Sequence, residues 1–200
     1  MTHEEALGDL ELAVLRCQNC RLGNIRRQAV FGEGNPEARL VFIGEGPGAE
    51  EDRQGRPFVG AAGQLLDKML SAMGMHRFQQ VYILNAVKCR PPNNRTPLPD
   101  EVEACRPHFD RQLAILDPAI VVLLGSTALK AVMGSEWRIT RARGQWIEQD
   151  GRWWMPTYHP AALLRNPAWK RDVWLDLKRV IDKYRELVDP NHDTPHYPRP

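Results

Sequence analysis

Apolar and polar positions follow two different periods along the chain, and their alternation predicts strands separated by helices. Short apolar runs over residues 39–44, 81–87 and 119–124 are typical of buried strands. Residues 61–73 place leucine and methionine at helical spacing, and a further helix is predicted over residues 100–116. Strands that alternate with helices indicate a mainly parallel sheet covered by helices on both faces.

The two ends of this pattern carry helix-start signals. Thr2 and Glu5 have the spacing of a capping box, which predicts a helix ending near Cys17. Asn166-Pro167 has the chemistry of a helix start and predicts a long helix to about Val188.

The remaining segments complete the sheet and its connections. Residues 145–158 predict a hairpin around an Asp150-Gly151 turn, and its second arm supplies a fourth strand. Residues 45–60 and 90–99 are rich in glycine or proline and are predicted loops, whereas Ser126 can cap the helix after the third strand. The expected fold class is α/β, a three-layer α/β/α arrangement with a mainly parallel, four-stranded central sheet.

Length and composition describe a single globular domain. The chain has 200 residues, 42% of them hydrophobic and 26% charged, which excludes a disordered, collagen-like or polytopic membrane protein. We expect one domain over residues 1–188 and a disordered tail over residues 189–200, which contain four prolines. No apolar run approaches the roughly 18 residues of a membrane span, and residues 1–5 lack the order of a secretory signal, so the expected compartment is the cytoplasm.

Charge adds a possible partner without deciding it. The net charge of +2 is too small to indicate nucleic acid by itself. Residues 138–179, however, carry nine Lys/Arg and four Asp/Glu, and residues 88–95 carry three basic residues and no acid. A solvated polar face and a phosphate-binding surface both remain open.

Four cysteines suggest a metal centre. Cys17 and Cys20 form a C-x2-C pair, and fifteen residues separate Cys89 from Cys105. Four thiolates suffice for zinc or for an iron–sulfur cluster, and the basic neighbours of each cysteine would stabilise thiolates. The wide second spacing is unlike a pair of zinc knuckles and favours a cluster, while zinc and four merely buried thiols stay as alternatives.

Three polar residues fall where a parallel sheet binds its ligands, beyond the carboxyl ends of strands. Glu45 lies within the Gly-Glu-Gly-Pro-Gly segment 44–48, where it either stabilises the turn or takes part in chemistry. Asn85 ends an apolar strand, where an unpaired amide costs about 1–3 kcal/mol, and its amide suits the edge of a base. His159 follows the last strand and is either structural or functional. Segment 44–48 lacks both the dinucleotide fingerprint and the P-loop lysine, so no nucleotide cofactor is expected.

Long motifs in a fixed order resemble the iron–sulfur (family 4) uracil-DNA glycosylases. They are segment 44–48 followed by Glu51-Asp52, residues 55–60, Asn85 with residues 88–92, and residues 159–167. The match runs from about Cys17 to the last helix. The resemblance implies the uracil-DNA glycosylase fold and a structural [4Fe-4S] cluster. Its implied metal ligands are Cys17, Cys20, Cys89 and Cys105.

The same resemblance implies a role for each site residue, with uracil flipped out of DNA into a pocket. Phe58 is expected to stack on the base, and Asn85 to hydrogen-bond an edge that cytosine would present with donor and acceptor reversed. His159 is expected to donate to O2 of the departing base, and Glu45 to position water or stabilise the sugar cation. The implied catalytic residues are Glu45 and His159. The implied uracil-binding residues are Glu45, Gly46, Pro47, Gly48, Phe58, Asn85 and His159.

Further residues are expected to contact DNA. Leu163, Leu164 and Arg165 would form a wedge that fills the space left by the flipped nucleotide. The expected DNA-binding residues are Ser126, Arg141, Arg143, Leu163, Leu164 and Arg165. A relative in the superfamily captures the abasic sugar covalently on a histidine in the corresponding stretch. Residues 138–144 contain no histidine, so the resemblance implies turnover in place of covalent capture. The expected role of Trp153, Trp154, Trp169 and Trp174 is packing in the core or against the sheet, with base stacking as the alternative.

The resulting hypothesis is a monofunctional glycosylase of base excision repair. Its partner would be uracil-containing DNA, double- or single-stranded, with no membrane, and the protein would be a monomer associated with the nucleoid. One alternative is an iron–sulfur DNA-binding module that recognises uracil with little turnover. Another is a zinc-stapled small-molecule hydrolase that uses Glu45 and His159.

Overall fold

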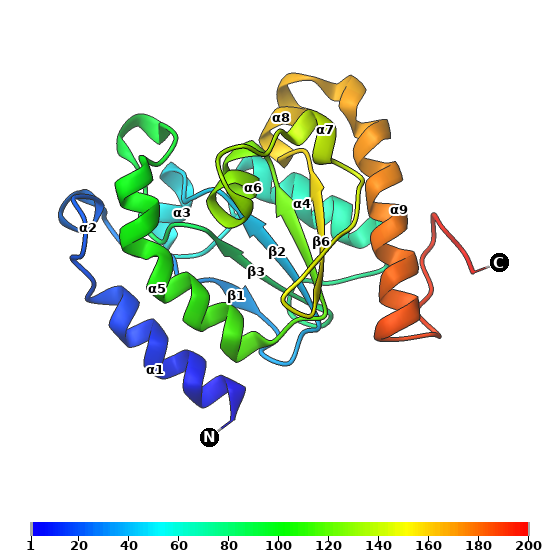
Figure 1. Cartoon of the computed structure of the whole chain (residues 1–200), viewed down its shortest axis with the longest axis horizontal. Coiled ribbons are helices and arrows are strands. Elements are labelled where there is room, and N and C mark those ends of the chain that lie inside the picture. Colours follow the sequence, from blue (N-terminus) through cyan, green and yellow to red (C-terminus); the bar gives the residue numbers. More distant parts are fainter. Residues whose placement is uncertain (1, 200) are drawn as a thin grey trace.

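The computed structural model describes residues 2–199, which form three layers (Figure 1). Helices lie on both faces of a twisted sheet, with α1 and α5 on one face and α4 and α9 on the other. The fold class expected from the sequence, a three-layer α/β/α arrangement, is confirmed.

The sheet has four parallel strands at its centre and a short antiparallel strand at each edge. Within residues 2–199 it contains six strands in the order β1-β3-β2-β4-β6-β5. The strands are β1 (Glu33–Gly34), β2 (Leu40–Gly44), β3 (Val81–Asn85), β4 (Ile120–Leu124), β5 (Ile147–Gln149) and β6 (Arg152–Thr157). The predicted hairpin is β5–β6, and the four predicted parallel strands form the centre. The sequence pattern missed β1 because two residues are too few to show a period.

The helices are α1 (His3–Leu15), α2 (Leu22–Ile25), α3 (Ala49–Gln54), α4 (Ala61–Ala72), α5 (Pro99–Leu116), α6 (Ser126–Met133), α7 (Ile139–Ala142), α8 (Pro160–Arg165) and α9 (Lys170–Leu187), with 3-10 turns at Pro92–Asn94 and Pro167–Trp169. The predicted capping box of α1 is present, because the Thr2 hydroxyl accepts from the Glu5 amide at 3.2 Å and the Glu5 carboxylate from the Thr2 amide at 2.8 Å. Within the described residues, none of these helices is long and apolar enough to cross a membrane.

Three local predictions were wrong in detail. Residues 45–60 were predicted to be a loop but contain the helix α3. This helix has only six residues between two glycines, which is too short to show an apolar stripe in the sequence. Ser126 is the first residue of α6 and not its cap; the cap position belongs to Gly125, at a φ of +93°. Asn166-Pro167 opens a 3-10 turn, and α9 itself begins at Lys170.

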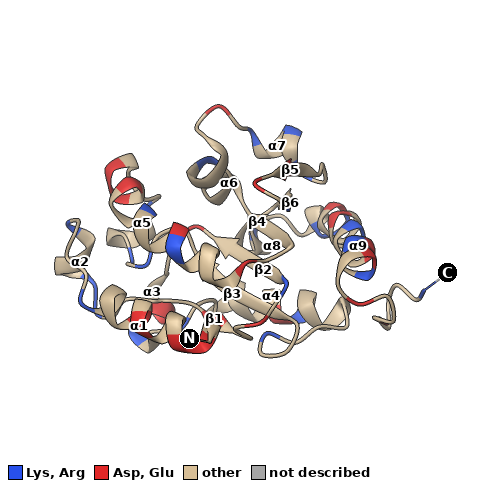
Figure 2. Cartoon of the chain, turned by 60° about the horizontal axis from the view of Figure 1, so that its bottom comes forward, with Lys and Arg blue, Asp and Glu red and all other residues tan. Residues whose placement is uncertain are grey.

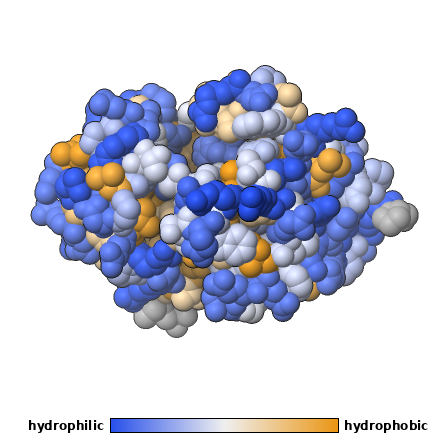
Figure 3. Space-filling view, turned by 45° about the horizontal axis from the view of Figure 1, so that its top comes forward, coloured by the Kyte–Doolittle hydropathy of each residue, from blue (hydrophilic) through white to orange (hydrophobic). Residues whose placement is uncertain are grey.

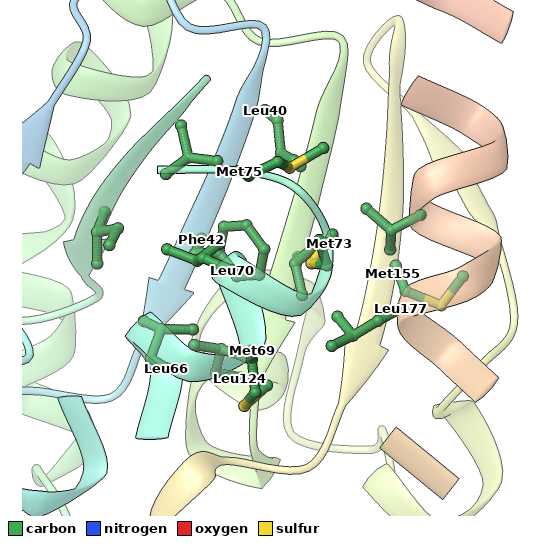
Figure 4. Close-up of a cluster of buried hydrophobic side chains, with 14 of the residues drawn as sticks. Leu40, Phe42, Leu66, Met69, Leu70, Met73, Met75, Leu124, Met155 and Leu177 are labelled. Carbon is green, nitrogen blue, oxygen red and sulfur yellow. The ribbon is translucent and has the colours of Figure 1, made fainter. Parts of the chain in front are cut away.

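Alternating strand residues divide the core into two clusters, as the two-residue period of a strand requires. On β2, Leu40 and Phe42 face the helices α4 and α9, whereas Val41 and Ile43 face α1 and α5. Figure 4 shows the first cluster, in which side chains from α4, the sheet and α9 point toward one another. Both faces of the sheet are therefore closed, and only the strand ends are left to form a site.

The segment after α9 differs from the expectation of a disordered tail. His192 is buried, with Nε2 at 2.8 Å from the Met73 carbonyl oxygen. Arg185 of α9 donates to the carbonyl oxygens of His192 and Tyr197 at 3.0 and 2.7 Å. Polar anchors of this kind leave no apolar periodicity in the sequence, so the pattern could not reveal them.

Candidate active site and cysteine centre

A cavity of about 680 Å³ opens beyond the carboxyl ends of the central strands; we call it the strand-end cavity. Glu45 follows β2, Asn85 ends β3, Gly125 follows β4, and His159 follows β6 by two residues. All four residues line the cavity, and Gly44 of β2 pairs directly with Asn85 of β3. The structure thus brings together the three polar residues that the sequence placed at strand ends.

Two glycines provide the space that these side chains need. A Cβ on Gly44 would lie 2.4 Å from Oδ1 of Asn85 and 2.5 Å from the Phe58 ring. Gly125 has a φ of +93°, and a Cβ there would lie 2.9 Å from Cβ of His159. Side chains larger than hydrogen at either position would displace a residue that lines the cavity.

Phe58 is held in a strained conformation beside His159. Its φ is +52°, a left-handed value that costs a non-glycine residue about 1–3 kcal/mol. The Phe58 ring stacks on the His159 ring with centroids 5.6 Å apart and an angle of 28°. Buried Arg77 donates to the carbonyl oxygens of Pro57 and Phe58 at 3.0 and 2.8 Å. The hydrogen bonds of Arg77 therefore stabilise the strained backbone conformation that places the Phe58 ring in the cavity wall.

Glu51 joins the two loops that form this wall. Its Oε1 accepts from the amides of Val59 and Gly60, both at 2.9 Å, and its Oε2 accepts from the Gly48 amide at 3.2 Å. The sequence analysis quoted Glu51 within a motif but gave it no role. The role shows only in three dimensions, because the carboxylate bonds to backbone amides of two separate loops.

The hydrogen bonds around segment 44–48 limit which amides can face a ligand. Pro47 has no N–H, and the N–H of Gly48 already donates to Glu51. Gly46 remains as the amide of residues 46–48 that can donate into the cavity, which these three residues line. A Cβ on Gly46 would lie 2.7 Å from Cγ2 of Val87, so this position also needs glycine.

His159 is set up as a neutral hydrogen-bond donor. It precedes α8, and its Nδ1 accepts from the Ala161 amide at 3.0 Å. A neutral imidazole that accepts at Nδ1 carries its proton on Nε2. Burial, together with nearby Arg165, lowers the pKa of His159 to about 4. At neutral pH the ring is therefore uncharged and offers the Nε2–H group.

The Glu45 side chain is partly shielded from solvent. Burial raises the pKa of the Glu45 carboxyl, and a hydrogen bond with the Thr127 side chain acts in the opposite direction. Thr127 and Ser126 both line the cavity at the start of α6. The carboxylate form of Glu45 is thus less favoured than in water.

The four cysteines line a second, much smaller space, which we call the cysteine cavity. Cys17 follows α1 and Cys20 precedes α2, whereas Cys89 follows β3 and Cys105 belongs to α5. Segments far apart in the sequence therefore bring all four thiols to one place. His108, one turn after Cys105, lines the same cavity, and its Nε2 is buried without a hydrogen-bond partner among the described residues.

The chemistry of the cysteine cavity fits a bound cationic group. Burial raises the pKa of Cys89 and raises that of Cys105 to about 11, although Arg26 and Lys88 act in the opposite direction. Arg26 donates to Sγ of Cys89 at 2.9 Å, and the Lys88 amide donates to Sγ of Cys105 at 3.3 Å. Among residues 2–199, no three His, Cys, Asp or Glu side chains are grouped closely enough to hold a single metal ion.

Comparison with known proteins gives the family. Residues 31–178 match the sequence model of the Uracil DNA glycosylase superfamily. A type-4 uracil-DNA glycosylase of Thermotoga maritima is 48% identical over 182 residues, which are 90% of this chain and 91% of that protein. The chain belongs to the type-4 uracil-DNA glycosylases. The family predicted from the motifs is therefore confirmed.

Two further members of the type-4 uracil-DNA glycosylases show similar agreement. The protein of Sulfurisphaera tokodaii is 44% identical over 193 residues, 92% of this chain and 86% of its own length. That of Archaeoglobus fulgidus is 40% identical over 185 residues, 88% of this chain and 92% of its own length. These are hydrolases of N-glycosyl bonds, and the chain is an enzyme of this class.

The wedge expected in type-4 uracil-DNA glycosylases is only partly exposed here. Leu164 and Arg165 of α8 are exposed, and Arg165 lines the strand-end cavity. Leu163 is only 1% exposed and packs in the core beside α4 and α9. Successive residues on a helix point about 100° apart, so a run of three cannot share one exposed face. The structure thus places Leu163 in the core and not in the expected wedge.

Arg141 and Arg143 also differ from each other. Arg141 is exposed on α7. Arg143 donates through Nη2 to Oδ1 of Asp176 at 2.7 Å and to the Asp172 carbonyl oxygen at 2.7 Å. The guanidinium of Arg143 is therefore engaged inside the protein, whereas that of Arg141 can reach a phosphate. Figure 2 shows basic residues on α7 and both signs of charge along α9.

Three residues that the sequence analysis did not assign to the site also line the strand-end cavity: Arg95, Tyr158 and Trp169. Arg95 forms a bidentate ion pair with Glu101, at 2.8 and 2.7 Å. Tyr158 stacks on Trp169 with ring centroids 4.4 Å apart and an angle of 17°. No spacing in the sequence distinguished Trp169 from the packed tryptophans.

The face of the molecule drawn in Figure 3 is mainly hydrophilic, with separate apolar patches.

Proposed function

We propose that the chain flips uracil out of DNA into the strand-end cavity and hydrolyses its N-glycosidic bond, leaving an abasic site for base excision repair. The observation that carries the proposal is the convergence of a neutral, donor-ready His159 with Phe58, Asn85 and Glu45 in one cavity. The family supports uracil-DNA glycosylase activity, and the geometry supports these roles.

Recognition of the base rests on Phe58 and Asn85. The flipped base stacks on the Phe58 ring, whose position Arg77 fixes. The carboxamide of Asn85 bonds the uracil edge through one acceptor and one donor. Cytosine reverses these groups at the same edge and leaves buried partners unpaired, which typically costs about 1–3 kcal/mol for each group. Uracil is therefore bound and cytosine rejected.

Bond cleavage rests on His159 and Glu45. As the N1–C1′ bond breaks, negative charge develops on O2 of the departing base. The Nε2–H of His159 donates to this oxygen, with the Gly46 amide as a second donor. The Glu45 carboxylate positions the attacking water or stabilises the sugar cation. Residues 138–144 contain no histidine that could capture the sugar, so the enzyme turns over and leaves the strand uncut.

The cysteine cavity would hold a structural [4Fe-4S] cluster on Cys17, Cys20, Cys89 and Cys105. The proposal of a cluster in place of a single zinc rests on the spacing of the cysteines in the sequence, and the structure supports it in that all four cysteines line one cavity. When bound, the cluster supplies a cross-link between segments. It would fix both ends of the 89–105 segment, in which residues 91 and 94–96 line the strand-end cavity.

The decisive experiment uses the purified holoenzyme and end-labelled oligonucleotides that carry one uracil, thymine or cytosine, in single- and double-stranded form. We expect release of uracil, and alkali cleavage at the uracil position alone, with no strand break before alkali. His159→Ala should reduce the single-turnover rate by at least about 100-fold, the loss typical of an oxyanion-stabilising donor. Asn85→Ala should reduce it by about 5- to 150-fold, which corresponds to about 1–3 kcal/mol for lost recognition of the base.

Two results would contradict the proposal. Binding of the uracil oligonucleotide without release of free uracil would favour a DNA-binding module. Unchanged rates in both variants, with activity present, would remove His159 and Asn85 from the site.

A further inference from the structure

We infer that Tyr158 and Trp169 form a second base-binding subsite, which stacks the base of the nucleotide next to the excised uracil. This inference rests on the proposed function, because it assigns a further part of the substrate to the same cavity.

Two adjacent residues hold two separate aromatic stacks in the wall of one cavity. The ring of His159 stacks on Phe58 at 5.6 Å, whereas the ring of Tyr158 stacks on Trp169 at 4.4 Å. The cavity volume of about 680 Å³ exceeds what a single pyrimidine ring fills. A polynucleotide whose uracil enters the first stack therefore brings a neighbouring nucleotide close to the second.

Trp169 is exposed where the other tryptophans pack. Its relative exposure is 36%, whereas that of Trp154 is 2%. One face of its indole packs on the Tyr158 ring, and the residue ends the 3-10 turn Pro167–Trp169. Both contacts hold the indole in position. An exposed indole beside a nucleic-acid site offers a π-face to any base, which makes stacking independent of sequence.

A chain of buried contacts holds this platform in place. The guanidinium of Arg143 lies 5.4 Å from the ring centroid of Tyr158. Asp176 accepts from Arg143 and also from the Thr157 hydroxyl, both at 2.7 Å. The order Asp176, Arg143, Tyr158, Trp169 therefore leads from the core to the surface. Preorganisation of this kind lowers the entropic cost of binding.

The surrounding charge fits a nucleic acid. Arg165, Lys170 and Arg171 are exposed close to Trp169 in the sequence. Single-stranded nucleic acids are bound by basic surfaces that carry aromatic stacking residues, which is the combination found here. Because the platform continues the wall of the proposed uracil site, the occupant we assign is the neighbouring base of the same strand.

The test combines protein variants with altered substrates. Trp169→Ala and Trp169→Phe are compared with the wild-type holoenzyme on single-stranded oligonucleotides. In these oligonucleotides the base 5′ or 3′ of the uracil is present or replaced by a tetrahydrofuran abasic analogue. Trp153→Ala is the matched control, since Trp153 packs edge-on against Trp146, away from the strand-end cavity.

The expected result is a coupling between Trp169 and one neighbouring base. Trp169→Ala should raise KM by about 5- to 150-fold on the intact oligonucleotide with little change in kcat. The penalty should vanish when the base on the 5′ or the 3′ side is absent. Trp169→Phe should keep most of the wild-type KM, and Trp153→Ala should show no dependence on the neighbouring base.

An equal loss in Trp169→Ala with and without both neighbouring bases would overturn the inference, as would wild-type kinetics of this variant on every substrate. Failure of the proposed function would look different, because the wild-type protein would then release no uracil from any oligonucleotide.

Discussion

In the strand-end cavity, charged side chains fix the backbone, whereas in the cysteine cavity the backbone places four thiols around a space. Glu51 and Arg77 bond to backbone amides and carbonyls, so the wall around Phe58 is complete without a ligand. Cys89 and Cys105 are buried, and burial raises the pKa of both thiols. One site is held by hydrogen bonds of the chain itself, and the other is the site that we propose to be held by a bound cluster.

Lys88 lines the cysteine cavity and also bonds to the end of β3. Its side chain is buried, and Nζ donates to the Asn85 carbonyl oxygen at 3.0 Å and to Oε1 of Gln112 at 2.6 Å. The next residue is Cys89, a member of the cysteine cavity. The end of β3 therefore carries the amide proposed to recognise the base and, four residues later, a proposed cluster ligand. Disturbing the cysteine cavity should therefore reach the strand-end cavity through this short connection and through the 89–105 segment, which lines the latter.

The largest expected effect comes from removing the cation that fixes Phe58. Arg77→Ala leaves the carbonyl oxygens of Pro57 and Phe58 and the nearby Glu33 carboxylate without their buried partner. We expect a loss of about 3–5 kcal/mol in the free energy of unfolding, as for other broken buried ion pairs. Chemical denaturation measures this loss, and single-turnover excision by the variant at low temperature should also be slow.

A matched control is available in Arg56, which is half-exposed and pairs with the same Glu33 carboxylate. Arg56→Ala should cost no more than about 1 kcal/mol, as exposed ion pairs do. Equal losses in the two variants would show that Arg77 acts through Glu33 alone and not on the Phe58 loop. The visible absorbance of a bound cluster should be unchanged in both.

The reverse disturbance is Cys89→Ala, which leaves no donor atom at this position. Loss of a cluster ligand should remove iron and visible absorbance and cost several kcal/mol, since loss of a bound metal is among the most destabilising single changes. Iron content, absorbance and thermal unfolding measure these effects. In variant protein that stays folded at low temperature, excision should be reduced less than in His159→Ala. A variant that retains full iron would remove Cys89 from the ligand set.

The pH dependence of excision should depend on the strand-end cavity alone. Glu45 acts as a carboxylate with a raised pKa, so the single-turnover rate should fall with decreasing pH at values above the ordinary carboxyl pKa of 4.5. His159 gains its proton only near pH 4 and contributes at the acid extreme. Glu45→Gln should lower the rate by about 10- to 1,000-fold and remove the first acid limb. An acid limb that persists in this variant would assign it to another group.

The two regions also differ in how far the sequence could predict them. The strand ends, Glu45, Asn85 and His159 were located because a parallel sheet gathers its carboxyl ends at one edge. The cysteines required only their number and spacing. The interior roles of Leu163 and Arg143 were missed, since orientation on a short helix and the partner Asp176 depend on packing. The bonds of Glu51 and Arg77 were invisible for the same reason, because their acceptors and donors are backbone groups.

The smallest expected effect separates Arg165, at the rim of the strand-end cavity, from Arg143, which is paired inside the protein, in their role toward DNA. Arg165 is exposed at the cavity rim, so Arg165→Ala should weaken binding of an uncleavable oligonucleotide and reduce the slope of log K against log salt by about 1. Arg143→Ala should leave that slope unchanged. It should lower the melting temperature, because buried Asp176 loses its ion-pair partner. Fluorescence anisotropy between about 50 and 200 mM salt measures the slope. An unchanged slope in Arg165→Ala together with a reduced one in Arg143→Ala would reverse the assignment and place the phosphate contact on the α7 side of the cavity.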